Sequence, residues 1–351
     1  MNKFKELTRL WIDKHSKIDM IKYITTVTRF LVKLKLRYCY AISLLYVISR
    51  CPISNHVYVP RTDHRFIDIA VSNSFNWKAK FEIWRKLSNR PIAVFDSGVG
   101  SLSIIKELKA EIPTEDLIYF ADRENFPYGT KSPEQLNEIM IKSIKSLEPY
   151  SPKLIIMASN TPSVQVLENV RECTSIPIMG VKPPLAEAAR LTKKKHIGIM
   201  ATESTLRSIQ LRQQIAREVP QKIFVTRINA SPLIRVIEDG SFFASNEIRQ
   251  AVLDSTFQPE AEDIIDVITL SSTHLPLIKD YLESLFSTIK FVDPAQKTAK
   301  DVKKFLKDNG ISKKTGTGKM LVFVTGDKIE FQQALRQMGF KYKVQSISTP
   351  F

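Results

Sequence analysis

Cysteine is scarce in this chain of 351 residues. Its three cysteines, Cys39, Cys51 and Cys173, form neither a C-x-x-C pair nor a Cys/His cluster. An odd number of isolated cysteines argues against a disulfide scaffold and gives no support to a zinc site. We therefore expect free structural thiols and no metal, in a reducing compartment, which favours a cytoplasmic location.

Long apolar runs are also absent. No segment reaches the roughly 18 to 20 continuous apolar residues of a membrane-spanning helix. The nearest approach, residues 38–49, follows three basic residues in the manner of a signal peptide. It begins far from Met1 and no small-residue cleavage site follows it, so we do not expect secretion.

An excess of positive charge is missing from most of the chain, although the formal net charge is +16. Residues 1–90 hold 18 Lys and Arg against 6 Asp and Glu, whereas residues 91–351 hold 34 against 30. The main body shows no global basic patch, so we expect no nucleic acid as a partner. Residues 1–90 are expected to form a basic, poorly ordered extension, or to be translated sequence upstream of the true start. The basic helical pattern at residues 30–36 leaves contact with a membrane surface or a protein partner as the alternative.

From residue 91 onward, short apolar runs alternate regularly with helical patterns. The chain is long enough for two domains, and 43% apolar with 25% charged residues is typical of a soluble globular protein. The alternation predicts βαβ units and therefore an α/β fold with parallel sheets. Strands are expected at residues 92–95, 117–121, 154–158, 176–179, 196–200, 222–226, 266–270, 289–292 and 320–324. Helices are expected at residues 101–110, 133–147, 161–171, 184–191, 204–218, 275–285 and 295–307, and a last strand-helix-strand unit follows a loop at 310–318.

Two stretches of the chain are built alike. Residues 153–163 and 266–276 each carry an apolar run that breaks into small polar residues, Ser159-Asn-Thr in the first and Ser271-Ser-Thr-His in the second. In an open parallel sheet the ligand site lies at the carboxyl ends of the strands. The two breaks therefore predict two related lobes that face one ligand.

Charged and polar groups in these breaks are the candidate site residues. The run from Asp96 to Ser101, Asp-Ser-Gly-Val-Gly-Ser, has the glycine-rich context in which backbone N–H groups hold an anion, with an ordinary turn as the alternative. Asp96 favours a function because a carboxylate at such a strand end needs a partner. His274 is expected to be catalytic or to orient a substrate, with a structural role as the alternative. We expect residues 315–319, Thr-Gly-Thr-Gly-Lys, to form a loop and His196 to lie at the surface or a strand edge.

Several ordered motifs resemble one family. They are Phe95-Asp-Ser-Gly-Val-Gly, Tyr119-Phe-Ala-Asp, Phe126-Pro-Tyr-Gly-Thr-Lys-Ser132, Ser159-Asn-Thr-Pro-Ser163, Thr202 to Ser208, Pro232 with Glu238 and Gly240, Thr273-His-Leu-Pro276 and Val324-Thr-Gly-Asp327. Together they resemble the aspartate/glutamate racemase superfamily, most closely glutamate racemase, from about residue 92 to residue 347.

The resemblance implies two pseudo-symmetric α/β lobes with the ligand between them. Lobe 1 would comprise residues 91–186 and 287–351, and lobe 2 residues 187–286. It implies a cofactor-independent isomerase, a racemase whose partner is a small acidic amino acid such as glutamate or aspartate, and it leaves a homodimer open. The residues implied to contact the substrate are Asp96, Ser97, Tyr128, Gly129, Asn160, Thr161, Thr273 and His274.

In this family two cysteines, one in each lobe, exchange the α-proton, and the matching positions here are Ser159 and Ser272. A serine hydroxyl is a weaker acid than a thiol by several pKa units, which costs on the order of 5 kcal/mol or more when the base forms. The step would then be roughly a thousandfold slower or worse. A serine base needs a neighbour that takes its proton. We expect Asp96 to assist Ser159 and His274 to assist Ser272.

Three functions follow as hypotheses. The first is a two-base racemase or related isomerase. The second is a catalytically silent protein that keeps the fold and binds a small acidic ligand. The third, hydrolysis or acyl transfer by a serine nucleophile, is the weakest, because Ser159-Asn-Thr is not a G-x-S-x-G motif.

Overall fold

The computed structural model describes residues 56–60, 66–70, 87–257 and 261–347. The chain divides into two compact units, Met1–Trp84 and Arg85–Phe351. In the first unit, strands β1 (His56–Pro60) and β2 (Phe66–Ala70) pair antiparallel, which the sequence analysis did not predict. The expected poor order of the N-terminal segment and the helical pattern at residues 30–36 otherwise lie outside the described residues.

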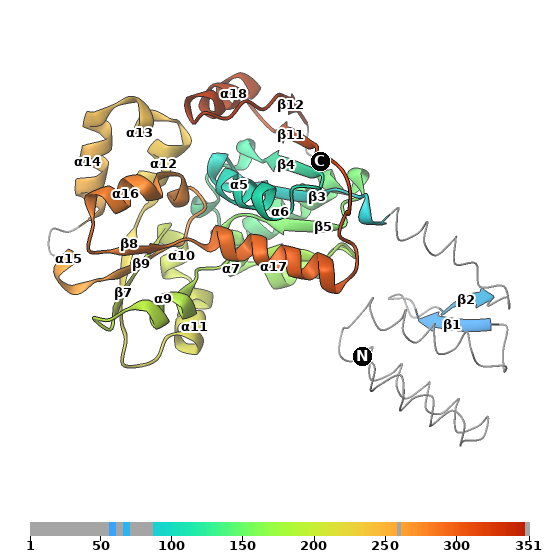
Figure 1. The fold of residues 1–351 in the computed structure, drawn as a ribbon, viewed down its shortest axis with the longest axis horizontal. Coiled ribbons are helices and arrows are strands. Elements are labelled where there is room, and N and C mark those ends of the chain that lie inside the picture. The colour runs from blue at the N-terminus through green and yellow to red at the C-terminus, as the bar shows by residue number, and fades with distance from the viewer. Residues whose placement is uncertain (1–55, 61–65, 71–86, 258–260, 348–351) are drawn as a thin grey trace, which may run out of the picture. The chain divides into compact units, whose positions relative to one another are not determined.

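The larger unit is built on two parallel sheets (Figure 1). The sheet of lobe 1 has the strand order β12-β11-β4-β3-β5-β6, and the sheet of lobe 2 has the order β10-β9-β7-β8. All neighbouring strands in these two sheets run parallel, as the alternating pattern predicted. The strands are β3 (Ile92–Asp96), β4 (Leu117–Ala121), β5 (Leu154–Met157), β6 (Ile178–Gly180), β7 (His196–Ala201), β8 (Phe224–Asn229), β9 (Val267–Leu270), β10 (Lys290–Val292), β11 (Met320–Val324) and β12 (Val344–Ser346).

Strand β10 lies in the other lobe from the one expected. We expected lobe 1 to resume at residue 287, but Lys290 of β10 pairs with Val267 of β9 in the lobe 2 sheet. The helix between these two strands completes a βαβ unit, which places consecutive parallel strands side by side. The chain returns to lobe 1 with α17 (Pro294–Asp308), whose apolar residues pack in the lobe 1 core.

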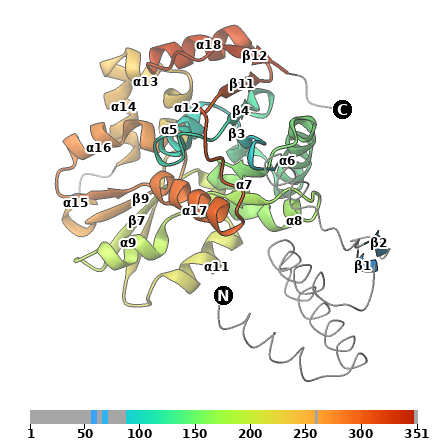
Figure 2. The ribbon, with the colours of Figure 1, turned by 45° about the vertical axis from the view of Figure 1, so that its right-hand side comes forward.

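Helices cover both faces of the lobe 1 sheet, which is why β3 is buried throughout its length and apolar as far as Phe95. Ile92 and Val94 point into one cluster, formed with α5, α17 and α18, whereas Ala93 and Phe95 point into another, formed with α6 and α8. Figure 2 shows α5 and α17 on one side of this sheet and α6 and α8 on the other. The helices of lobe 1 are α5 (Leu102–Glu111), α6 (Pro133–Leu147), α7 (Asn160–Gln165), α8 (Leu167–Arg171), α17 and α18 (Lys328–Gln337).

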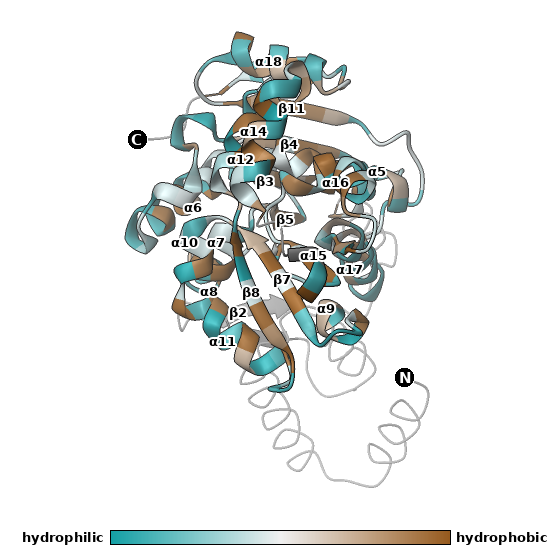
Figure 3. Ribbon diagram, turned by 90° about the vertical axis from the view of Figure 1, so that its left-hand side faces the viewer, coloured by the Kyte–Doolittle hydropathy of each residue, from teal (hydrophilic) through white to brown (hydrophobic). Residues whose placement is uncertain are grey.

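Lobe 2 follows the same design with shorter helices. In Figure 3 strand β7 is coloured mostly apolar, whereas β8 mixes apolar and polar residues. The helices associated with this sheet are α9 (Leu185–Leu191), α10 (Glu203–Arg207), α11 (Ile209–Glu218), α12 (Ser231–Glu238), α13 (Ser241–Ala244), α14 (Asn246–Thr256), α15 (Ala261–Ile264) and α16 (Lys279–Leu285).

Three of the expected helices are divided in the structure. The helix expected at residues 161–171 breaks at Val166 into α7 and α8, and the one expected at 204–218 breaks at Ser208. The Ser208 hydroxyl accepts a hydrogen bond from the backbone N–H of Leu211 and so caps α11. The third, expected at 275–285, begins with a 3-10 turn, η5 (Leu275–Ile278). At Val166 and at the start of η5 no side chain caps the new helix.

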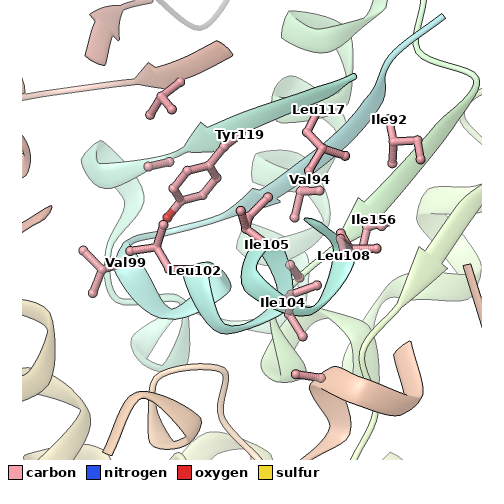
Figure 4. Packing of buried hydrophobic residues seen from close by; sticks show 14 of the residues in the cluster. Ile92, Val94, Val99, Leu102, Ile104, Ile105, Leu108, Leu117, Tyr119 and Ile156 are labelled. Carbon is pink, nitrogen blue, oxygen red and sulfur yellow. The ribbon is translucent and has the colours of Figure 1, made fainter. Parts of the chain in front are cut away.

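The core beneath the site is packed around Tyr119 of β4 (Figure 4). Its ring is fully buried and points toward Val99 and Leu102, next to the turn that follows β3. Its hydroxyl donates a hydrogen bond to the carbonyl oxygen of Gly98. Burying one such side chain is worth about 1.5–3 kcal/mol. The packing therefore fixes the turn at residues 97–101 from below.

Candidate functional site

The carboxyl ends of strands from the two lobes meet at Asp96. This carboxylate ends β3 of lobe 1 and is 1% exposed. Its Oδ1 accepts a hydrogen bond of 2.7 Å from the backbone N–H of Ser97, and its Oδ2 accepts one of 2.8 Å from Thr273 Oγ1 in lobe 2. A second bond between the lobes runs from Ser103 Oγ to the Thr273 carbonyl at 3.0 Å. The structure therefore brings Asp96, Ser97 and Thr273 together.

Burial raises the pKa of Asp96 from 3.8 to about 6, because water no longer stabilises the charged form. The weaker, opposing influences are the charge of His274 and hydrogen bonds donated by Thr273, by the Ser97 backbone and by the Ser159 hydroxyl. The carboxyl group of Asp96 is thus tuned to change protonation close to neutral pH. Such tuning is typical of groups that transfer protons in catalysis.

The two serines lie at the strand ends at which they were expected. Ser159 follows β5, precedes α7 and is 8% exposed, and its hydroxyl reaches Asp96. Ser272 follows β9 and is 7% exposed. Its hydroxyl makes no hydrogen bond with any residue in the described part of the chain. The structure therefore places Ser159 beside Asp96, whereas Ser272 makes no hydrogen bond to His274.

His274 is bound instead to Glu238, a residue that we did not single out as a site residue. Its Nε2 lies 2.7 Å from Glu238 Oε2, and the two side chains are 5% and 2% exposed. Glu238 ends α12, and a signal for its position was present in the sequence. Ile234, four residues earlier, belongs to the buried apolar face of α12, and positions i and i+4 of a helix share a face.

Glycine is required at two positions of the turn after β3, because lobe 2 side chains pack directly against the backbone. A Cβ at Gly100 would lie 2.5 Å from His274 Nδ1 and 2.6 Å from Thr273 Oγ1. A Cβ at Gly98 would overlap the carboxylate of Glu238. The backbone N–H of Val99 donates to Glu238 Oε2 at 2.8 Å. The glycines of Asp-Ser-Gly-Val-Gly thus admit the lobe 2 acid and imidazole.

Asn160 and Thr161 start α7 beside Ser159, and both side chains are buried. The Asn160 amide nitrogen donates to the Val181 carbonyl at 3.1 Å, but its Oδ1 is buried without a hydrogen-bond partner. Thr161 Oγ1 lies 3.1 Å from the hydroxyls of both Thr202 and Thr205 in lobe 2. A buried acceptor without a donor costs stability, so Asn160 Oδ1 is an available acceptor for a ligand.

Tyr128 and Gly129 lie in a turn that Asp122 holds in place. The Tyr128 hydroxyl donates to Asp122 Oδ2 at 3.1 Å, and its ring is buried in the core. Burial raises the pKa of Tyr128 well above its ordinary value, so it remains a hydrogen-bond donor. A Cβ at Gly129 would lie 3.1 Å from Thr202 Cβ, so this backbone faces lobe 2 closely. Gly129 is therefore placed at the lobe contact, whereas the Tyr128 side chain supports the turn from within.

Other sequence features lie away from this site. His196 is on β7, where its Nε2 lies 2.8 Å from Thr226 Oγ1 on the neighbouring strand. Residues 315–319 form a loop before β11, in which the Lys319 N–H donates to Asp116 Oδ1. Cys173 is exposed and free, and Cys39 and Cys51 lie outside the described residues.

No metal cluster or membrane span is present in the described part of the chain. Within those residues, no group of three or more His, Cys, Asp or Glu side chains is arranged to hold a metal ion. None of the helices described is long and apolar enough to cross a membrane.

Comparison with known proteins places this architecture in a family. The model of the Asp/Glu/Hydantoin racemase family matches residues 100–302. A glutamate racemase of Geobacter metallireducens is 35% identical over 229 residues, which cover 64% of this chain and 83% of that protein. A glutamate racemase structure from Bacillus anthracis has a TM-score of 0.66 and 26% identity, covering 75% of this chain and 99% of that one. A glutamate racemase of Francisella tularensis, solved with D-glutamate, has a TM-score of 0.65 and 28% identity over 75% and 98% of the two chains. The chain therefore belongs to the Asp/Glu/Hydantoin racemase family.

Proposed function

We propose that this protein is a cofactor-independent racemase of a small acidic amino acid, glutamate or aspartate. The observation that carries the proposal is the Asp96 carboxylate, which has a pKa of about 6 and lies between the Ser159 hydroxyl and the lobe 2 residue Thr273. This arrangement sets a group capable of taking a proton at the meeting point of the two lobes. The relative solved with D-glutamate supports the substrate class.

In this mechanism one lobe removes the α-proton and the other replaces it. Ser159 takes the proton from Cα while Asp96 takes the hydroxyl proton of Ser159. Ser272, from the opposite lobe, gives a proton to the other face of Cα. The substrate loses one proton and gains one, Ser159 ends as a hydroxyl again, Asp96 ends with one proton more and Ser272 with one proton fewer. A base with a pKa near neutrality is the most effective, which favours Asp96 over an ordinary carboxylate.

The substrate would be held by the polar groups around these serines. The buried, unpartnered Oδ1 of Asn160 accepts a hydrogen bond from the substrate ammonium. The Thr161 hydroxyl and the backbone N–H of Gly129 are donors for the carboxylates, whereas the Ser97 N–H and the Thr273 hydroxyl already donate to Asp96. Two carboxylates and one ammonium match this mixture of donors and acceptors.

A second candidate is a protein of the same fold that binds the acidic ligand without turning it over. The observation that favours it is the Ser272 hydroxyl, which has no hydrogen bond to His274 or to any other described residue. A serine without a group to take its proton is a poor base. This candidate predicts ligand binding, seen as thermal stabilisation, without chemistry.

The test is hydrogen exchange at Cα. The full-length protein is incubated in D₂O with L- or D-glutamate or aspartate, and deuterium at Cα is measured by mass spectrometry. The racemase predicts deuterium in both enantiomers, and Ser159→Ala/Ser272→Ala is the matched control that abolishes it. Thermal stabilisation by the amino acid with no deuterium above the control would instead support the silent binding protein. If the amino acid produced no stabilisation and no exchange, both candidate functions would be contradicted.

A gain-of-function variant separates lost chemistry from a distorted site. Ser159→Cys/Ser272→Cys supplies two thiols whose pKa is several units lower than that of serine, so the exchange rate should rise by about a thousandfold or more. An unchanged rate would show that the two positions do not carry the reacting groups.

A further inference from the structure

Arg123 lies beside the site but belongs to none of the groups considered so far. It stands in η2 (Arg123–Asn125), directly after the buried Asp122 that follows β4. One terminal nitrogen of its guanidinium pairs with Glu238 Oε1, and the other pairs with Glu330 Oε1 of α18 at 2.6 Å. The Arg123 side chain is only 11% exposed, and its guanidinium also lies near the Phe126 and Phe331 rings. It is therefore a largely desolvated cation with a fixed orientation.

The carboxylate of Glu238 accepts from three donors. Oε1 faces Arg123, and Oε2 accepts from the backbone N–H of Val99 at 2.8 Å and contacts His274 Nε2 at 2.7 Å. A carboxylate paired with arginine has no hydrogen to offer, so Nε2 of His274 must be the donor. The other ring nitrogen, Nδ1, is then the one that gains or loses a proton. It lies against Gly100, 2.5 Å from the point where a Cβ would stand.

We propose that Arg123 is a positioning residue: by holding Glu238 it fixes the orientation and tautomer of His274 and offsets the negative charge that Glu238 places beside the ring. This inference rests on the proposed function only in that His274 lies at the same site, next to Thr273 and against Gly100. Arg123 itself contacts no reacting atom and acts only through Glu238.

The charges that face His274 give the direction of the effect. Glu238 reaches it from α12, Asp96 from the end of β3, and Arg123 stands on the far side of the Glu238 carboxylate. Tyr119 from β4 is held neutral, because burial raises its pKa well above the ordinary value. Without the guanidinium, the imidazole would face two acidic groups with no competing cation. Its protonated form would then be favoured over a wider pH range.

The chain offers a matched control on the same guanidinium. Glu330 also pairs with Arg123, but its side chain is 59% exposed, so its charge is screened by water and salt. Glu330→Gln removes one ion pair of Arg123 and leaves Glu238 untouched. Arg123→Lys keeps the charge, whereas Arg123→Gln keeps a hydrogen-bond donor and removes the charge.

The experiment is an NMR titration of His274 in the full-length protein labelled with ¹⁵N-histidine, with the signal assigned through His274→Gln. Arg123→Gln should raise the titration midpoint of His274 by about one pH unit or more. Arg123→Lys and Glu330→Gln should each change it by less than about 0.3 pH unit. A midpoint in Arg123→Gln within about 0.3 pH unit of the original would overturn the proposal, because Arg123 would then serve stability alone.

A second readout needs no variant at the arginine. In the unaltered protein, the ¹⁵N shifts above the midpoint should show hydrogen on Nε2 and none on Nδ1, and an Nδ1–H tautomer would contradict the proposal. Both readouts are independent of turnover. If Cα exchange is absent while the titration behaves as expected, the proposed function fails and the role of Arg123 stands.

Discussion

The raised pKa of Asp96 predicts how the free energy of unfolding changes with pH. In the folded chain the pKa of this carboxyl group is about 6, whereas the pKa of an exposed aspartate is 3.8. The folded state therefore binds more protons than the unfolded state between these values. The stability that Asp96 contributes is fully present below about pH 3.8 and is lost as the pH rises through 6.

The size of the effect follows from the same values. A difference of about two pKa units corresponds to roughly 3 kcal/mol of unfolding free energy once the group is ionised in both states. About 1.4 kcal/mol of this loss falls between pH 5 and pH 8, where the protein can be studied easily. Asp96→Asn removes the titrating group and keeps its shape. Its amide can accept from Ser97 and can donate to the Thr273 hydroxyl, so the two bonds survive.

The assay is chemical denaturation of the original chain and of Asp96→Asn at pH 5, 6, 7 and 8. Other titrating groups cancel in the difference between the two proteins. The free energy of unfolding of Asp96→Asn, relative to the original, should increase by about 1.4 kcal/mol from pH 5 to pH 8. A difference that stays constant over this range would refute the reasoning, because Asp96 would then titrate as an exposed carboxyl group does.

Two further predictions concern close packing at the site and a buried ion pair at the opposite end of the lobe 1 sheet. Gly100→Ala should destabilise the protein by about 1–3 kcal/mol and weaken ligand binding, because the methyl group would lie 2.5 Å from His274 Nδ1. Thermal unfolding with and without glutamate measures both effects. An unchanged unfolding midpoint would contradict the close packing. Lys153→Met should cost about 3–5 kcal/mol in denaturant unfolding, because it leaves the buried partner Glu115 unpaired, whereas Lys153→Met/Glu115→Leu should recover most of that loss.

The parallel sheets could be predicted from sequence because apolar runs and helical patterns alternate without ambiguity from residue 91. Strand β10 was assigned to the wrong lobe, because a short apolar run has the same sequence pattern in either sheet. Only its pairing with β9 shows which sheet it belongs to. The helix breaks at Val166 and Ser208 were missed for a related reason. Helical periodicity continues across both, and the break at Ser208 depends on a local cap by one hydroxyl, whereas the break at Val166 has no side-chain cap.

The lobe 1 half of the candidate site was easier to predict than the lobe 2 half. Asp96 ends β3 and Ser159 comes just after the adjacent strand β5, so the topology alone brings them together. The contact of His274 with Glu238 and Arg123 depends on side chains from three separate elements. No sequence pattern specifies such a meeting, although the buried face of α12 pointed to Glu238.

The central claim is that Ser159 and Ser272 exchange a proton with opposite faces of one substrate. It is tested most directly by following deuterium at Cα in the single variants Ser159→Ala and Ser272→Ala, with each enantiomer of glutamate and of aspartate supplied separately. The two-base account predicts that the original chain labels both enantiomers of its substrate. Each variant should lose interconversion and retain exchange with only one enantiomer, a different one in each variant. Exchange that neither substitution alters, or no exchange in the original chain, would contradict the account.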